Sequence, residues 1–287
     1  MTQIQPFQLD SPSSFGGVLH GFVHVPNLEK FAAPRPVVVI CHGFKGFMEW
    51  GFFPPLADLL CERGFVTVRF NFSGSGMQPG DELVTDLDAF RKNTFSLELE
   101  ETQKILGSLE QIAPSMVDTQ RIGLLGHSRG GAAAILAAAS EPWVDRIGAL
   151  VTWAALCSFE RYAQYEEQWH KNGVIPTRNG RTGQELELGI ELLEDLRGNE
   201  TALDLAAASA RIQAPWSIVH GTHDESVPFS EAHDLAGWAT GTHEVVEIKD
   251  GSHTFGARHP FVGPTRELVR AMNATQIWFR RHLARSP

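Results

Sequence analysis

The chain has 287 residues, of which 43% are hydrophobic and 20% charged, a composition typical of a folded globular protein rather than a disordered one. Its formal net charge of -10 argues against nucleic acid and against an anionic membrane surface as partners. No apolar run approaches the ~18 residues of a membrane helix, and the N-terminal residues lack the basic and apolar regions of a signal peptide. Because Cys41, Cys61 and Cys157 are odd in number and widely spaced, we expect reduced thiols and a cytoplasmic protein.

Taken in chain order, the sequence predicts two opening strands and then an alternation of buried strands and amphipathic helices. The predicted elements are strands 3–9, 18–25 and 37–41, helix 54–63, strand 65–70, helix 95–112, strand 121–125, helix 128–140, strands 147–154 and 216–220, helix 230–239, strand 244–248 and helix 266–283. Such alternation is typical of a doubly wound, mostly parallel sheet with helices on both faces. We therefore predict a single α/β domain over residues 1–287 with an eight-stranded sheet.

About 60 residues before the strand at 216 interrupt this alternation. They include Tyr162, Tyr165 and Trp169, a turn at Asn179-Gly180, and an acidic, helix-like stretch over 184–196, but no predicted strand. Long excursions within a compact domain commonly form lids or caps. We predict a small helical cap over residues 157–214, with helices packed passively on the sheet as the alternative.

A candidate nucleophile lies in the pentapeptide Gly126-His127-Ser128-Arg129-Gly130, which matches the pattern G-x-S-x-G. A predicted strand precedes it and an alanine-rich helix follows, which is the setting of a serine on a sharp strand-to-helix turn. The two glycines lack the Cβ atoms that would collide in so tight a bend. We therefore identify Ser128 as the candidate nucleophile, with a turn that has no catalytic role as the alternative.

This serine turn and the order of strands and helices around it resemble the α/β-hydrolase superfamily over nearly the whole chain. The sequence looks most like the dienelactone-hydrolase-like and cinnamoyl (feruloyl) esterase-like branches, which also resemble the catalytic domain of prolyl oligopeptidases. One departure lies in the loop at 69–76, where Asn71 fits the relatives but Ser73 stands where a basic residue is common. The resemblance therefore supports no pairing between that loop and the oxyanion region.

The family order of nucleophile, acid and histidine implies the other two members of a catalytic triad. Asp224 lies four residues after His220 in a segment that resembles the family pattern G-x-x-D-x-x-V-P, and is the expected acid. His253 follows the last predicted strand and is the expected base. The competing residues are Glu225 and Asp250 for the acid and His259 for the base.

The resemblance also implies two backbone donors for a developing oxyanion, the N–H of Arg129 and the N–H of Phe44 in the segment H-G-F-K-G. Because only backbone atoms would act there, we expect the Phe44 side chain to be replaceable and Gly43 not to be. Several aromatic residues lie on segments that border the predicted site and favour an apolar or aromatic acyl group. These candidate substrate-binding residues are Phe47, Trp50, Trp153, Trp169 and Phe255.

Together these features predict a serine hydrolase of the carboxylesterase type that cleaves small to medium esters through an acyl-enzyme. No metal is expected, because the histidines around Asp224 lack the glutamate of an H-E-x-x-H motif, and no cofactor is needed. The expected partner is a small-molecule ester, and we expect neither nucleic acid nor a membrane to bind. The formation of a homo-oligomer is left open. The alternatives are a prolyl-oligopeptidase-like peptidase or amidase, and a non-catalytic binding protein on a hydrolase scaffold.

Overall fold

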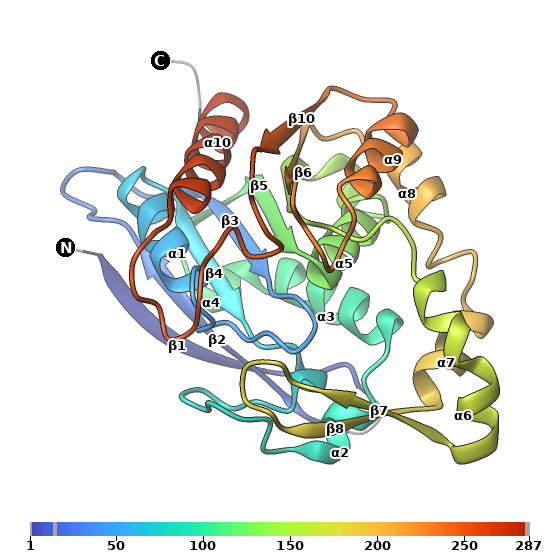
Figure 1. The fold of residues 1–287 in the computed structure, drawn as a ribbon. Coiled ribbons are helices and arrows are strands. Elements are labelled where there is room, and N and C mark those ends of the chain that lie inside the picture. Colours follow the sequence, from blue (N-terminus) through green and yellow to red (C-terminus); the bar gives the residue numbers. More distant parts are fainter. Residues whose placement is uncertain (1, 14–15, 285–287) are drawn as a thin grey trace.

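The computed structural model describes residues 2–13 and 16–284 and contains an eight-stranded sheet with helices on both faces (Figure 1). The strand order is β1-β2-β4-β3-β5-β6-β9-β10. The pairs β1–β2 and β2–β4 are antiparallel, and the other neighbouring pairs are parallel. The strands are β1 (Gln3–Asp10), β2 (Val18–Val25), β3 (Arg35–Cys41), β4 (Val66–Phe70), β5 (Val117–His127), β6 (Ile147–Trp153), β9 (Trp216–Gly221) and β10 (His243–Ile248).

Two layers of helices sandwich this sheet. Helices α1 (Phe53–Glu62) and α10 (Arg266–Leu283) cover one face (Figure 1). The other face carries most of the remaining helices, of which α3, α5 and α9 pack against it or against one another and α8 packs on α5. The bounds of the remaining helices outside the insertion are α2 (Leu87–Arg91), α3 (Phe95–Gly107), α4 (Leu109–Ile112), α5 (Arg129–Ala138), α8 (Leu205–Arg211) and α9 (Ser230–Trp238).

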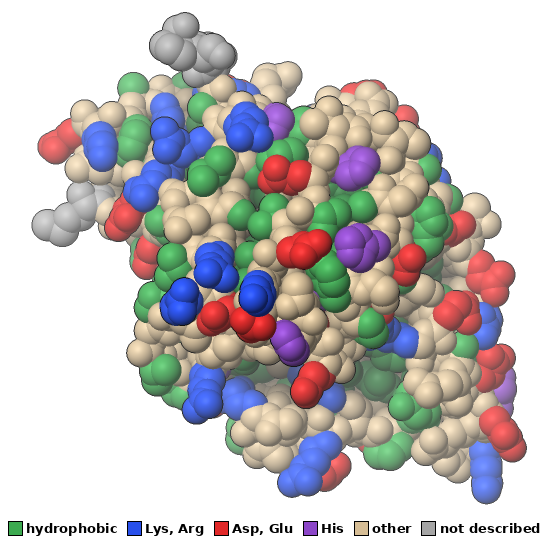
Figure 2. Space-filling model, turned by 45° about the horizontal axis from the view of Figure 1, so that its top comes forward, with side chains coloured by type: hydrophobic (Ala, Val, Ile, Leu, Met, Phe, Trp, Pro, Cys, Tyr) green, Lys and Arg blue, Asp and Glu red, His purple; other side chains and the backbone are tan. Residues whose placement is uncertain are grey.

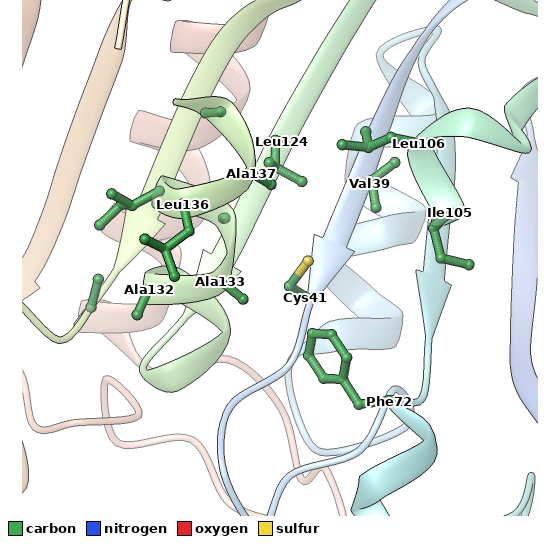
Figure 3. Close-up of a cluster of buried hydrophobic side chains, with 14 of the residues drawn as sticks. Val39, Cys41, Phe72, Ile105, Leu106, Leu124, Ala132, Ala133, Leu136 and Ala137 are labelled. Carbon is green, nitrogen blue, oxygen red and sulfur yellow. The ribbon is translucent and has the colours of Figure 1, made fainter. Parts of the chain in front are cut away.

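Strand β3 shows why a continuous apolar run forms a central strand here. Val39 and Cys41 point to one face and Val38 and Ile40 to the other, and all four are at most 1% exposed. A strand buried on both faces needs no polar alternation. Figure 3 shows the first of these faces, where Val39 and Cys41 lie near Leu124 of β5, the alanines of α5 and the side chains of α3.

The predicted fold class is confirmed, and each predicted strand of the sheet is present. Strand β5 begins earlier than predicted, at Val117. The single helix predicted over 95–112 is instead two helices, α3 and α4, with a break at Ser108. Gly107 precedes that break, and glycine is a poor helix former because of its conformational freedom. The predicted turn between β1 and β2 falls partly on residues 14–15, which lie outside the described residues.

The segment 157–214 differs most from the sequence prediction. Its predicted absence of strands is wrong, because β7 and β8 form an antiparallel hairpin around the turn predicted at Asn179-Gly180. In β8, Leu186 and Leu188 are buried while the alternate glutamates are exposed, so a two-residue period is present within a composition typical of helices. Ahead of α8, the segment contains a 3₁₀ helix (Glu160–Tyr165), α6 (Glu166–Asn172), β7 (Val174–Arg178), β8 (Glu185–Gly189) and α7 (Glu191–Gly198).

The surface adds two observations. Figure 2 shows side chains of both charges interspersed over one face of the molecule, without a large continuous hydrophobic patch. Across residues 2–13 and 16–284, no helix is both long enough and apolar enough to cross a bilayer.

Candidate active site

Ser128 lies on the sharp turn between β5 and α5. Its backbone has φ 56° and ψ -123°, a strained conformation for a residue other than glycine. Its N–H donates a hydrogen bond of 2.8 Å to the carbonyl oxygen of Trp153 on the neighbouring strand β6. A Cβ on Gly126 would lie 2.2 Å from the Gly130 oxygen, and one on Gly130 would lie 2.2 Å from the His42 oxygen. The glycines of the pentapeptide are therefore required by the packing of the turn.

Three side chains from three loops meet at this point. The Oγ atom of Ser128 lies 3.0 Å from Nε2 of His253, and Nδ1 of His253 lies 2.8 Å from Oδ2 of Asp224. These residues follow β5, β10 and β9, respectively, and the carboxyl ends of these parallel strands lie at the same edge of the sheet. The Asp224 carboxylate is fully buried, whereas the His253 side chain is 21% exposed and accessible to a ligand.

The Asp224 carboxylate is held by four donors. Its Oδ1 accepts hydrogen bonds of 2.9 Å from the N–H groups of Ser226 and Val227. Its Oδ2, besides facing His253, lies 3.3 Å from Nε2 of the buried His220. Burial alone would raise the pKa of Asp224, but the hydrogen bonds from His220 and His253 outweigh burial and hold that pKa below its ordinary value. Asp224 is therefore an anion that orients the His253 ring.

The competing residues for the acid and the base lie elsewhere. Glu225 is exposed, and Asp250 pairs with His223 at 3.5 Å on the surface. His259 accepts a hydrogen bond of 3.0 Å from the Gly51 N–H, so its other nitrogen, Nε2, carries the proton that it donates to Glu82. Among the described residues, no group of three or more His, Cys, Asp or Glu side chains is placed to hold a metal ion.

The two expected oxyanion donors lie on segments next to Ser128. Arg129 is the first residue of α5, where a helical N–H has no acceptor within the helix. Phe44 lies in the loop after β3, which turns through a 2.9 Å hydrogen bond from the Gly46 N–H to the Gly43 oxygen. A Cβ on Gly43 would lie 2.9 Å from the Ser128 Cβ. Glycine at this position therefore allows the loop to approach Ser128 closely.

Two histidines that sequence reasoning did not single out support the surrounding loops. Burial lowers the pKa of His127 to about 3, so the ring is neutral, and its Nε2 donates a 2.9 Å hydrogen bond to the His253 carbonyl oxygen. Burial likewise lowers the pKa of His42 to about 4. His42 accepts a hydrogen bond from the Phe72 N–H and donates one to the Gly43 oxygen, which links the loops after β3 and β4. Both histidines lie in the motifs described from the sequence, but only packing shows their contacts.

A cavity of about 140 Å³ opens beside Ser128 and His253. Of the five aromatic residues expected there, Trp50 lines the cavity. Phe53, the first residue of α1, also lines it, although sequence reasoning did not single it out. The other four are at most 1% exposed and lie in the hydrophobic core, so the expectation that they border the site is not met. These four are Phe47, Trp153, Trp169 and Phe255.

A larger cavity of about 450 Å³ lies between Phe44 and the inserted segment. Tyr162 and Tyr165 of the predicted cap line this second cavity together with Ile175 and Leu188. Phe44 lines both cavities. The loop that carries the expected oxyanion donor therefore lies between Ser128 and the insertion.

Comparison with known proteins places this geometry in a family. The family model Hydrolase_4, described as serine aminopeptidase, S33, matches residues 32–178, just over half of the chain. The chain is similar to an uncharacterized 31.7 kDa protein in the traX-finO intergenic region of Escherichia coli, with 25% identity over 282 residues that cover 87% of this chain and 92% of that protein. It is also similar to 2,6-dihydropseudooxynicotine hydrolase of Paenarthrobacter nicotinovorans, with 26% identity over 230 residues, 77% of this chain and 53% of that protein.

Among solved structures, the fold is similar to that of Est1E from Butyrivibrio proteoclasticus with ferulic acid bound. The TM-score is 0.71 at 20% identity, and the match covers 97% of this chain and 100% of that chain. The resemblance to α/β-hydrolases and to the feruloyl-esterase-like branch is thereby confirmed at the level of the fold. The chain belongs to the Hydrolase_4 family, described as serine aminopeptidase, S33, and is a hydrolase with the α/β-hydrolase fold.

Proposed function

We propose that this protein is a serine hydrolase that cleaves carboxylic esters of small to medium acyl groups. The observation that carries the proposal is the chain of contacts from Ser128 Oγ to His253 Nε2 at 3.0 Å and from His253 Nδ1 to Asp224 Oδ2 at 2.8 Å. In such an arrangement the imidazole can accept the serine proton, and the buried carboxylate stabilises the imidazolium that forms.

The proposed reaction has two steps, acylation of Ser128 and hydrolysis of the acyl-enzyme. Ser128 Oγ bonds to the ester carbonyl carbon as its proton passes to His253, and the oxyanion accepts hydrogen bonds from the Phe44 and Arg129 N–H groups. The alcohol leaves with the proton from His253, which yields an acyl-enzyme. Water then attacks the acyl carbon, gives its proton to His253, and the free acid departs as Ser128 regains a proton. No step draws on a cofactor.

The cavities support the proposed size of the substrate. The space beside Ser128 measures about 140 Å³, which suits a short acyl chain or part of an aryl group rather than a folded polypeptide. The larger cavity behind Phe44 offers room for the rest of an extended substrate. The partner on this proposal is a small-molecule ester.

A panel of substrates tests the proposal. Purified protein should hydrolyse nitrophenyl butyrate and methyl cinnamate, and a fluorophosphonate should label Ser128. The Ser128→Ala variant, which we expect to keep the fold, serves as the blank. Labelling at Ser128 without turnover of any ester would rule out the proposed substrate class. Absence of labelling would favour the alternative of a non-catalytic binding protein.

The description of the matched family as serine aminopeptidase favours one second candidate, a peptidase or amidase acting through the same residues. The two candidates differ in the leaving group, because an amine must be protonated to leave whereas an alkoxide leaves more readily. Comparing kcat/KM for an ester with that for a matched alanyl or prolyl anilide separates them. We expect the ester to be well ahead, and an anilide that equals it would establish the peptidase instead.

A further inference from the structure

Arg129 supplies more than a backbone donor to the site, an inference that rests on the function proposed above. Its side chain is 2% exposed and lies at the N-terminus of α5, where the helix dipole disfavours a cation. Taking a guanidinium out of water also carries a desolvation cost, and ion pairs that recover it are often no more stable than apolar replacements. Stability alone therefore gives a weak account of an arginine at this position.

The charge of Arg129 is balanced by Glu98 from α3, which is 4% exposed. The Nε atom of Arg129 lies 3.0 Å from both carboxylate oxygens, and its Nη2 also donates to Oε1. Asn93 donates a further hydrogen bond of 2.8 Å to Oε1 of Glu98. Bidentate pairs of this kind fix the plane and the direction of the guanidinium. Glu98 therefore determines where the Arg129 side chain lies.

The guanidinium held in this way lies over the ring of Phe44. Its central carbon is 4.5 Å from the centroid of the Phe44 ring and 5.4 Å from that of Phe95. The Phe44 ring in turn stacks on Phe90 of α2, with the centroids 5.6 Å apart and the planes 27° apart. A cation over an aromatic face is attractive, and more so when both are desolvated.

The loop that carries Phe44 needs such support. This loop lies outside the regular strands and helices, between Gly43 and Gly46. Lys45, the residue after Phe44, has a positive φ of 58°. Backbone conformations of this kind persist only where surrounding contacts hold them. The position of the Phe44 N–H therefore depends on the contacts of this loop, which include the Gly46–Gly43 hydrogen bond and the stacking of the Phe44 ring on Arg129.

We propose that Glu98, Arg129 and Phe44 form an oxyanion clamp that sets the spacing between the two backbone donors. One donor is the N–H of Arg129 itself, and the other is the N–H of Phe44, which the Arg129 side chain holds by stacking. Glu98 is a positioning residue that touches no substrate and acts through Arg129. The proposal gives the Phe44 ring a role, whereas the sequence alone suggested that this ring is replaceable.

Two variants test the clamp without leaving a buried charge unpaired. In Arg129→Met/Glu98→Leu both charges are replaced by apolar groups, a change that proteins often tolerate. In Phe44→Leu the aromatic face is removed while the backbone donor stays. Phe95→Leu is the matched control, because it removes the other ring beside the same guanidinium but lies on α3, away from the donor loop. Phe44→Tyr keeps the aromatic face, so its kcat should lie close to that of the wild type rather than that of Phe44→Leu.

The readouts are kcat and KM on nitrophenyl butyrate per titrated active site, and Ki for a trifluoromethyl ketone, which adds to the serine as an oxyanion. For both clamp variants we expect kcat to fall roughly 10- to 100-fold with KM within about twofold. The ketone Ki should rise by the same factor as kcat/KM falls. Adding Phe44→Leu to the double variant should cost little more, because the two changes disrupt one contact.

Clamp variants that keep wild-type kcat and ketone Ki while losing only thermal stability would overturn the proposal. So would a Phe95→Leu control that loses as much kcat as Phe44→Leu does. Failure of the proposed substrate class is distinguishable from either result. A wild-type protein that labels at Ser128 but hydrolyses no ester would still report the clamp through the ketone Ki, which needs only the serine and the donors.

Discussion

The Lys45 ammonium donates a hydrogen bond of 2.7 Å to the carbonyl oxygen of Arg178. Lys45 directly follows Phe44 in the loop after β3, whereas Arg178 is the last residue of β7 in the insertion. The bond therefore joins the loop with the candidate oxyanion donor to the inserted hairpin. Two further contacts dock the same hairpin on the loop before α2, an ion pair of 3.0 Å between Arg181 and Glu82 and the hydrogen bonds of the Gln184 side chain.

Lys45→Met should loosen the hairpin without removing the reaction. The lost hydrogen bond is exposed and worth about 1 kcal/mol, so the global stability should change little. We expect amide exchange and tryptic cleavage around the turn at 179–183 to accelerate several-fold, while Ser128 still labels with a fluorophosphonate. Lys171→Met, which changes an exposed lysine on α6, is the control. Equal protection of the turn in both variants would show that Lys45 does not tether it.

Replacing the residues of the triad should reduce turnover to different extents. Ser128→Ala should abolish both ester hydrolysis and labelling at unchanged stability, because the nucleophile is lost. His253→Ala and Asp224→Asn should each reduce kcat by several orders of magnitude, with the asparagine the milder change. Kinetics on nitrophenyl butyrate measures the effects. The assignment is wrong if His259→Ala is the more damaging histidine variant or if another serine still labels.

A methyl group at Gly43 should damage the site although it touches no substrate. The added Cβ would lie 2.9 Å from the Ser128 Cβ, so the loop and the nucleophile must move apart. For Gly43→Ala we expect kcat to fall roughly 100-fold, because an oxyanion donor displaced by about 1 Å loses most of its effect. Gly180→Ala, in the hairpin turn where an added Cβ meets nothing within 4 Å, should leave kcat unchanged. A fully active Gly43→Ala would contradict the close approach described here.

Two tryptophans that were both predicted to border the substrate site should respond differently to replacement by alanine. Trp50 lines the cavity beside Ser128, so Trp50→Ala should change kcat/KM several-fold between butyryl and cinnamoyl esters at little cost in stability. Trp169 is fully buried, and its Nε1 donates a 2.9 Å hydrogen bond to the Leu188 oxygen. Trp169→Ala should cost about 3–5 kcal/mol of unfolding free energy. Chemical denaturation beside kinetics checks both, and an unaltered ester preference in Trp50→Ala would remove Trp50 from the substrate site.

Glu101 should make the stability of the protein depend on pH. This buried carboxyl of α3 accepts hydrogen bonds from Ser11 and from the Ser73 N–H, at 2.6 and 3.0 Å. Burial raises its pKa from 4.5 to about 7, so the folded state binds the proton more tightly than the unfolded state does. Its contribution is therefore fully present below pH 4.5 and is lost as the pH rises through about 7.

The Glu101→Gln variant isolates this effect, because glutamine fills the same space without ionising. Relative to the wild type, the variant should gain up to about 3 kcal/mol of unfolding free energy between pH 4.5 and pH 8. Denaturation curves at several pH values measure the difference. Glu100→Gln, which changes the exposed neighbour, should show no such trend. A constant difference between Glu101→Gln and the wild type would mean that Glu101 ionises normally.

The fold could be predicted from local strand and helix patterns. The contact among Ser128, His253 and Asp224 could be predicted from the local turn motif together with the residue order that the resemblance to α/β-hydrolases implies. A strand, a turn and the start of a helix surround Ser128, and the loops after β9 and β10 hold Asp224 and His253 next to strands that are themselves readable. The oxyanion clamp was not predicted, because it depends on how α3 packs against α5. Glu98 lies seven residues before Ile105 on the apolar stripe of α3, and a carboxylate in such a stripe is a signal that could have been used.

The wrong predictions concern segments whose local sequence pattern fits two different structures, so that only tertiary packing decides between them. Four aromatic residues assigned to the substrate site belong to the core, since an aromatic residue near a predicted loop has the same sequence signature in either place. The hairpin was missed because glutamate and leucine favour helices, while the alternation in β8 extends over only five residues. Neither distinction is encoded within a few neighbouring residues.

The insertion leaves the sheet after β6 and returns to it at β9, and these two strands are hydrogen-bonded neighbours, with Trp153 in register with Val219. Because the two strands are parallel, the connection must cross from the carboxyl end of β6 to the amino end of β9, and α8, which packs on α5, lies on this crossing. The elements ahead of α8 therefore place little constraint on the strands that the connection joins. Lineages could lengthen, shorten or exchange these elements while the strands that precede Ser128, Asp224 and His253 keep their order in the sheet. Selection for a new substrate would then act on a segment that lies outside the eight-stranded sheet and lines the cavity next to Phe44.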